Sequence, residues 1–181
     1  MNAGSLSRRY AKALMSLGVE MRSSEQFGKE LKQFADIICD EVLCDVLSNP
    51  TYPLSKRKAI LEEIAGKLRP SETVRNFVML MLDRNRITII GDVYRAYVIM
   101  TDEHAGRIRA AVTSARPLSR SDATKIKSAI EKQTGKEVLL NQNTDEELIA
   151  GTVTQIGSVI YDGSIRTQLA EMRRSLVDGR S

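Results

Sequence analysis

The chain has 181 residues, of which 42% are hydrophobic and 28% are charged, a composition typical of a folded globular protein and not of a disordered one. This length suits one large domain or two small ones. No apolar run approaches the ~20 residues that a membrane-spanning helix needs, so we expect no insertion into a bilayer. The formal net charge of +4 is mild, and most of the basic excess lies in the C-terminal part.

The N-terminal part carries the apolar periodicity of amphipathic helices. Phe27, Leu31, Phe34 and Ile38, for example, follow one another at spacings of four, three and four residues, which places them on one helix face. Short connections join the segments, and Asn49-Pro50 ends one of them because the residue before proline avoids the helical conformation. We therefore predict a six-helix bundle over residues 1–105, with helices at about 6–18, 23–38, 41–47, 55–68, 71–83 and 90–105.

Serines at three predicted helix starts favour N-caps. Ser23 is followed three residues later by Gln26, the spacing of a capping box, and Ser55 and Ser71 precede the fourth and fifth helices. We expect each hydroxyl to accept a hydrogen bond from an amide of the first turn.

The fifth predicted helix is apolar around most of its circumference. Residues 77–82 read Phe-Val-Met-Leu-Met-Leu, and only Asn76 and Asp83 mark a narrow polar stripe. Six such side chains represent about 9–18 kcal/mol of burial free energy, so nearly the whole helix must be covered. This helix is therefore either the centre of its own bundle or one wall of a groove that binds a partner's helix.

At Gly106 the period changes from that of helices to that of strands. Ile108, Ala110 and Val112 alternate with polar residues, which predicts a half-buried strand. A helix at about 119–133 follows, then strands at 137–141, 148–156 and 159–161, with a tight turn at Gly157-Ser158. A last helix carries its apolar residues between 165 and 176. The sequence predicts a small α+β domain over residues 106–181, and the protein as a whole is mainly α.

Residue patterns that support catalysis or metal binding are missing from the sequence. There is no phosphate-binding G-x-x-x-x-G-K-[ST] loop, and His104 is the only histidine, which excludes a histidine-based triad or a multi-histidine metal site. Cys39 and Cys44 fit no metal or redox motif, and we expect small buried apolar side chains there. We predict no catalytic residue, no cofactor and no metal. The basic cluster at residues 56–58 is either a hydrated face or a contact for a phosphate or an acidic partner.

Several short motifs, in order along both predicted domains, carry a family resemblance. Residues 9–14 read R-Y-A-K-A-L, Asn76-Phe77 opens the apolar helix, and Arg84 to Ile87 closes it. Residues 148–151 read L-I-A-G, and residues 156–169 carry I-G, then V-I-Y-D-G-S-I-R and a following leucine. The chain resembles the delta subunit of rotary ATP synthases, the counterpart of the mitochondrial oligomycin-sensitivity-conferring protein. Ala150, Ser158 and Tyr161 depart from the family's usual residues.

This resemblance implies a non-catalytic stator subunit. In that family the helical domain sits on the catalytic head and the C-terminal domain meets the C-terminal helices of the peripheral-stalk b subunits. The N-terminal helix of an α subunit lies in a groove between helices one and five, which would account for the apolar excess of the fifth helix. Core packing remains the alternative for each candidate groove residue: Tyr10, Ala13, Leu14, Leu17, Val78, Met79 and Leu82.

Two other functions and two locations stay open from the sequence. A basic helical nucleic-acid-binding protein would use residues 56–58 and the last helix, although the interleaved aromatics of such proteins are lacking. An enzyme would need a nucleophile–base pair that the sequence does not offer. The resemblance implies a peripheral protein at the cytoplasmic face of a bacterial inner membrane. Residues 1–19, which are basic and serine-containing with no acid, alternatively mimic an organelle transit segment.

Overall fold

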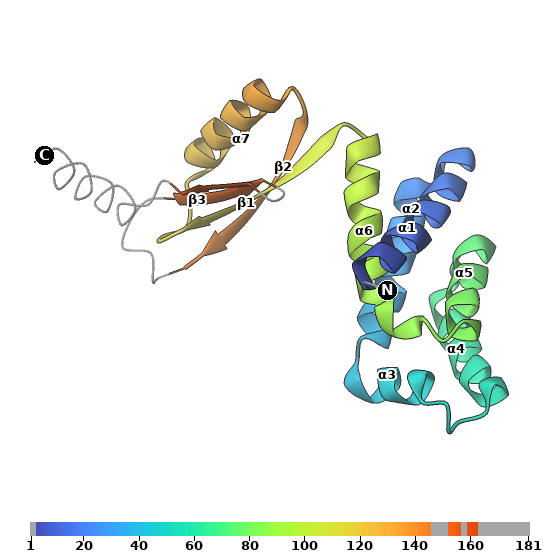
Figure 1. The fold of residues 1–181 in the computed structure, drawn as a ribbon. Coiled ribbons are helices and arrows are strands. Elements are labelled where there is room, and N and C mark those ends of the chain that lie inside the picture. Colours follow the sequence, from blue (N-terminus) through green and yellow to red (C-terminus); the bar gives the residue numbers. More distant parts are fainter. Residues whose placement is uncertain (1–2, 146–151, 157–158, 163–181) are drawn as a thin grey trace, which may run out of the picture. The chain divides into compact units, whose positions relative to one another are not determined.

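The computed structural model describes residues 3–145, 152–156 and 159–162, which form two compact units, Met1–Thr101 and Asp102–Ser181 (Figure 1). The division falls four residues before the boundary that the sequence predicts at 106. The elements, in chain order, are α1 (Ala3–Glu20), α2 (Ser24–Ile38), α3 (Glu41–Ser48), α4 (Leu54–Leu68), α5 (Glu72–Asp83), the 3-10 turn η1 (Ile87–Ile89), α6 (Ile90–His104), β1 (Arg107–Ser114), α7 (Arg120–Thr134), β2 (Glu137–Thr144), β3 (Thr152–Ile156) and β4 (Val159–Asp162).

The first unit is a bundle of helices around one apolar core, and the mainly α fold class is confirmed. The predicted α2 stripe faces inward, with Phe27, Leu31, Phe34 and Ile38 all essentially inaccessible to solvent. Every other bundle helix contributes fully buried side chains to the same cluster. Because the amphipathic stripes have helical spacing, they meet only when the helices pack side by side, as they do in Figure 1.

The predicted hydrogen bonds to serine hydroxyls are absent at all three helix starts. Ser23 and Ser71 are the N-cap residues of α2 and α5, but neither side chain accepts a hydrogen bond from its own helix, and α4 begins at Leu54 behind Pro53. The Ser23 hydroxyl donates backwards to the Met21 carbonyl at 3.0 Å. A local hydroxyl competes with other nearby acceptors, and the sequence pattern does not decide which of them it contacts.

The start of α5 is instead capped from α2. One carboxylate oxygen of Glu30 accepts hydrogen bonds from the Ser71 amide at 3.0 Å and from the Ser71 hydroxyl at 2.6 Å, and its other oxygen accepts from Gln26 Nε2 at 2.8 Å. A carboxylate at a helix N-terminus also complements the helix dipole. This long-range cap fixes where α5 begins relative to α2.

The predicted basic cluster at the start of α4 is not a uniform hydrated face. The Arg57 side chain is buried, with Nη1 donating to the Leu47 carbonyl at 3.1 Å and to Asn85 Oδ1 at 3.1 Å, while Nε donates to the Tyr52 carbonyl at 3.2 Å. Lys58 forms an ion pair with Asp83 at 2.7 Å. The guanidinium therefore joins the α3–α4 connection to the end of α5, which leaves it unavailable to a phosphate.

The expectation of two buried cysteines is also wrong. Cys39 is exposed because it forms the C-cap of α2, one residue past the last inward-facing position, and Cys44 on α3 is only half-buried. Partial burial raises the pKa of the Cys44 thiol.

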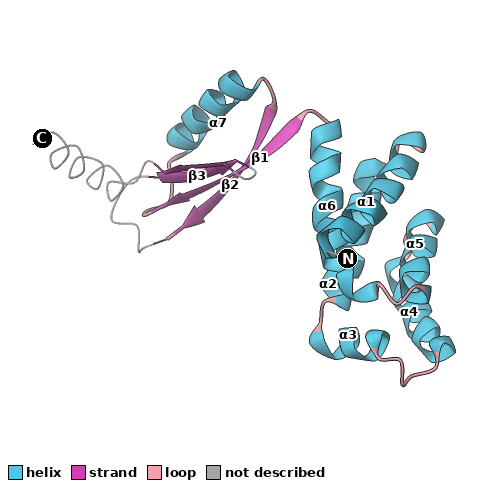
Figure 2. Ribbon diagram, viewed as in Figure 1, coloured by secondary structure: helices cyan, strands magenta, loops and turns pink. Residues whose placement is uncertain are grey.

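The second unit is the α+β domain that the sequence predicts. β1 and β2 are parallel and are connected by α7 (Figure 2). β1 also pairs antiparallel with β3, and β3 pairs antiparallel with β4, so that the strand order is β2-β1-β3-β4. α7 packs on the sheet through Ile130, beside Ala110 and Val138. Gly135 ends α7 in the left-handed conformation at φ 67°, as its place after the last apolar turn predicts.

One strand end, that of β2, lies well beyond the prediction. β2 continues to Thr144, because its polar second half still pairs residue by residue with β1 as far as Ser114. β3 begins at Thr152, and the predicted strand residues 148–151 lie outside the described part. The turn at 157–158 and the last helix over 165–176 also lie outside it.

Candidate functional site

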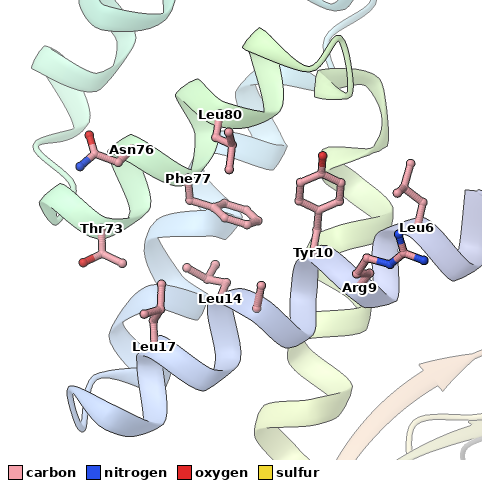
Figure 3. A pocket seen from close by; sticks show the side chains of 10 residues that line it. Leu6, Arg9, Tyr10, Leu14, Leu17, Thr73, Asn76, Phe77 and Leu80 are labelled. Atoms are coloured by element: carbon pink, nitrogen blue, oxygen red, sulfur yellow. The ribbon is translucent and has the colours of Figure 1, made fainter.

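An apolar groove of about 680 Å³ lies between α1 and α5 (Figure 3). Both helices contribute side chains that point into the shared space, and most of these side chains are hydrocarbon. The lining residues are Leu6, Arg9, Tyr10, Ala13, Leu14, Leu17, Thr73, Asn76, Phe77 and Leu80.

The two walls run antiparallel. The Tyr10 and Phe77 rings meet edge to face, with centroids 6.1 Å apart and planes at 74°. About one turn before Phe77 on α5, the Thr73 hydroxyl lies 3.6 Å from the sulfur of Met21, which directly follows the last residue of α1. Residue numbers therefore rise along α1 while they fall along α5. The aromatic pair, a geometry that contributes about 0.5–1.5 kcal/mol beyond its buried area, holds the walls in place.

The groove has a closed floor and an open rim. Leu14 is fully buried and Phe77 is 8% exposed, so these two side chains form the floor. Leu17 and Leu80, one on each wall, are 43% and 46% exposed. Large apolar side chains that stay half-exposed on facing walls are typical of a surface that a partner covers.

The structure brings the four α1 candidates together and separates the three α5 candidates from them. Tyr10, Ala13, Leu14 and Leu17 all line the groove. In contrast, Val78 and Leu82 are 1% and 0% exposed in the bundle core, and Met79 is half-buried against the same core. These three α5 residues therefore pack in or against the bundle core and are not among the residues that line the groove, and a partner contact at them stays a prediction.

The α5 wall is formed by residues that the sequence analysis missed. Val74, Val78 and Met81 face the bundle core. Because successive residues are 100° apart around a helix, the neighbouring face of α5 faces the groove. A signal was present in the sequence: Thr73 and Asn76 precede the apolar run, three residues apart, and Leu80 continues the same face one turn later. Polar residues in an otherwise apolar helix mark its solvent side.

A close contact between α1, α2 and α6 supports the α1 wall from behind. The buried Tyr97 hydroxyl donates to the Ser24 carbonyl at 2.9 Å, and burial raises the pKa of Tyr97 to about 12. Gly18 leaves room for this ring, since a Cβ there would lie 2.9 Å from the Tyr97 oxygen and 3.0 Å from Ser24 Cα. The position of α1 therefore depends on a residue that has no side chain.

Across residues 3–145, 152–156 and 159–162, no group of three His, Cys, Asp or Glu side chains is placed to hold a metal ion. His104 is exposed at the end of α6. None of the described helices is both long and apolar enough to cross a membrane.

Comparisons with known proteins agree with this fold over nearly the full length. The family model of the ATP synthase delta (OSCP) subunit matches residues 6–176. The ATP synthase subunit delta of Geotalea uraniireducens (strain Rf4) is 39% identical over 180 residues, 99% of this chain and 100% of that protein. That of Anaeromyxobacter sp. (strain Fw109-5) is 42% identical over 177 residues, 97% of this chain and 99% of that protein.

A chain of the cryo-EM structure of the Toxoplasma gondii mitochondrial ATP synthase hexamer shares the fold, with a TM-score of 0.69 at 16% identity over 95% of this chain and 97% of that one. The class is thus that of the stator-associated subunits of ATP synthase. This chain belongs to the ATP synthase delta (OSCP) subunit family, and the resemblance seen in the sequence is confirmed.

Proposed function

We propose that this chain is a non-catalytic stator subunit that joins the catalytic head of the ATP synthase to its peripheral stalk. Its α1/α5 groove binds the N-terminal helix of an α subunit, and its second unit binds the C-terminal helices of the b subunits. The connection resists the torque of the rotor, so that rotation inside the head does work on the catalytic sites. The observation that carries the proposal is the preformed apolar groove within a chain of this family.

The dimensions of the groove support a helix as its occupant. The α1 wall runs from Leu6 to Leu17, a rise of about 16 Å at 1.5 Å per residue, which matches about three turns of a bound helix. A helix that lies in a groove inserts side chains at i, i+3 or i+4 and i+7. The rim leucines are placed to flank such a row from both sides.

The groove's chemistry favours a protein helix over a small molecule. Its volume alone also fits the ~300–1,000 Å³ range of small-molecule pockets. Such pockets fix their ligands by convergent polar groups, whereas here the polar side chains Arg9, Thr73 and Asn76 sit among seven that are mainly hydrocarbon. An amphipathic helix needs only apolar contact at the floor and solvated polar residues at the rim.

The proposed location is the cytoplasmic face of a bacterial inner membrane, where the subunit is held by its partners without entering the bilayer. The bacterial relatives support this location. The alternative of a transit segment over residues 1–19 is not supported, since α1 spans Ala3–Glu20 and buries Ala11 and Leu14 in the bundle core. The nucleic-acid alternative requires an exposed basic cluster at residues 56–58, and Arg57, the middle residue of that cluster, is buried.

A pull-down with purified catalytic head tests the proposal. The full chain should retain the intact head on a resin and lose it when the α subunit lacks its N-terminal segment. The variant Leu80→Asp, which places a charge on the groove rim, should abolish retention, whereas Val42→Asp, at a 74% exposed valine on α3, should not. Equal retention of intact and truncated heads would assign head binding to another surface.

A further inference from the structure

A buried aspartate at the end of α6 is paired with two arginines of β1. Among the described residues, Asp102 is the one acidic side chain that is buried, and 8% of it is exposed. Its carboxylate accepts hydrogen bonds from Nε and Nη2 of Arg109, the second at 3.4 Å, and Arg107 Nε lies 3.9 Å from Asp102 Oδ1. A guanidinium that engages both oxygens of a carboxylate forms one of the stronger ion pairs in proteins. We call these three side chains the Asp102 cluster.

The Asp102 cluster fastens the end of a helix to the start of a strand. Asp102 lies in the last turn of α6, and Arg107 and Arg109 are the first and third residues of β1. Residues 105–106 alone separate the two elements. Because both guanidinium groups face the same carboxylate, loss of its charge would remove a partner from both of them.

The turn between α6 and β1 is held by backbone bonds that water can reach. Gly106 follows the helix in the left-handed conformation, at φ 65°, which a glycine adopts at little cost. Its amide donates to the Glu103 carbonyl at 3.1 Å, and its carbonyl accepts from the Glu137 amide, at the start of β2, at 3.2 Å. Gly106 is exposed, whereas the Asp102 carboxylate is shielded from solvent. The Asp102 cluster is therefore the shielded part of this connection.

α6 continues from the first unit into the second without a break. Tyr97 is fully buried in the bundle core, whereas the second unit begins at Asp102, further along the same helix. Among the described residues, none after Met100 contributes to the apolar cluster of the bundle. The last turn of α6 can therefore unwind without exposing the bundle core, and the Asp102 cluster opposes that unwinding.

We propose that the Asp102 cluster is a clasp that keeps the chain segment between the two units short. With the clasp closed, α6 runs to His104 and two residues separate it from β1. With the clasp open, residues 102–104 can unwind, and each then spans about 3.3–3.6 Å instead of 1.5 Å. The segment would lengthen by about 5–6 Å, so Asp102 is a positioning residue for the link between the units.

The clasp does not depend on the proposed function, but it matters to that function. In a chain that joins head and stalk through its two units, any pull between them passes along residues 101–107. The closed clasp resists extension there, because opening it separates a shielded carboxylate from the guanidinium groups that neutralise it.

Limited trypsin digestion of the full chain tests the clasp, because Arg107 and Arg109 are themselves sites at which trypsin cuts. A folded chain is cut where it opens, and the rate follows the population of the open form when closing is fast. Asp102→Asn should therefore raise the rate of cleavage after Arg107 and Arg109 at least about 10-fold. Mass spectrometry of the fragments 1–107 and 1–109 measures this rate. Because no binding partner takes part, the result is independent of whether the α1/α5 groove binds a helix.

Asp92→Asn is the matched control, since Asp92 lies on the same helix and pairs with Arg95, whose side chain is 75% exposed. Exposed pairs contribute little, so this variant should change the cleavage rates by less than about 2-fold. Equal rates of cleavage after Arg107 in wild type and Asp102→Asn would overturn the clasp. Acceleration to the same extent after Lys125 of α7 would also overturn it, because the whole second unit would then be unfolding.

A double-variant cycle tests whether Asp102 acts through Arg109. Arg109→Gln alone should accelerate cleavage after Arg107 about as much as Asp102→Asn does, and the double variant should accelerate it little further, because both changes remove the same interaction. Effects that multiply in the double variant would show that the two residues act independently and would overturn the clasp.

Discussion

Two leucines of α5, two residues apart, separate partner binding from core packing. Leu80 is 46% exposed on the groove rim and Leu82 is fully buried in the bundle core. Burying a whole leucine side chain is worth about 1.5–3 kcal/mol, so covering the exposed half of Leu80 contributes about 0.7–1.4 kcal/mol to binding. Leu80→Ala should therefore raise the Kd for an α-subunit N-terminal peptide about 3- to 10-fold while changing the free energy of unfolding by less than ~1 kcal/mol.

Leu82→Ala should have the opposite profile. The lost contacts and the remaining cavity lower the free energy of unfolding by about 2–5 kcal/mol, whereas the folded molecules keep their affinity for the peptide. Urea titration measures the first quantity and calorimetric titration at low temperature measures the second. If Leu80→Ala destabilised the bundle as much as Leu82→Ala did, or if Leu82→Ala alone weakened binding, the division of α5 into a groove face and a core face would be refuted.

The contact behind α1 gives two further predictions. Gly18→Ala should lower the free energy of unfolding by about 1–3 kcal/mol in urea titration, because the added Cβ meets the Tyr97 oxygen and the Ser24 backbone. Gly66→Ala, with open space around its Cβ, should instead raise the free energy of unfolding by about 0.5–1 kcal/mol. Similar changes for both variants would contradict the close approach at Gly18. Burial raises the pKa of Tyr97 from 10.0 to about 12 in the folded state. The neutral hydroxyl therefore contributes at most about 2–3 kcal/mol to the free energy of unfolding, a contribution that is fully present below pH 10 and is lost as the pH rises to about 12. Tyr97→Phe should flatten this part of the pH–stability curve, and an unchanged curve would argue against the assignment.

The sequence predicts the existence and type of the elements well because apolar periodicity is strong in them. The stripe of α2, from Phe27 to Ile38, is entirely buried as its spacing predicts. The switch from helical to alternating period at Gly106 likewise predicts β1 and the α+β unit. These features depend on local spacing, which the sequence displays directly.

Features that depend on distant residues were not predictable in the same way. The apolar run of α5 shows that most of the helix is covered, but it does not show which face turns inward. That rotation about the helix axis is set by the core residues that pack against Val78 and Leu82. The cap of α5 comes from Glu30, 41 residues away in sequence, and not from the adjacent Ser71 hydroxyl. The length of β2 is likewise set by pairing with β1, and its polar second half gives no local signal.

The buried Arg57 side chain has a further consequence for how the bundle responds to pH. Its hydrogen bonds connect a guanidinium with the carbonyl groups of Leu47 and Tyr52 and with the side-chain amide of Asn85. Carbonyls and amides do not titrate, and a guanidinium stays protonated at any pH that a cell reaches. The hydrogen bonds of Arg57, which connect α3, α4 and the end of α5, consequently lose no partner on acidification, so that this one support of the α5 wall persists at low pH.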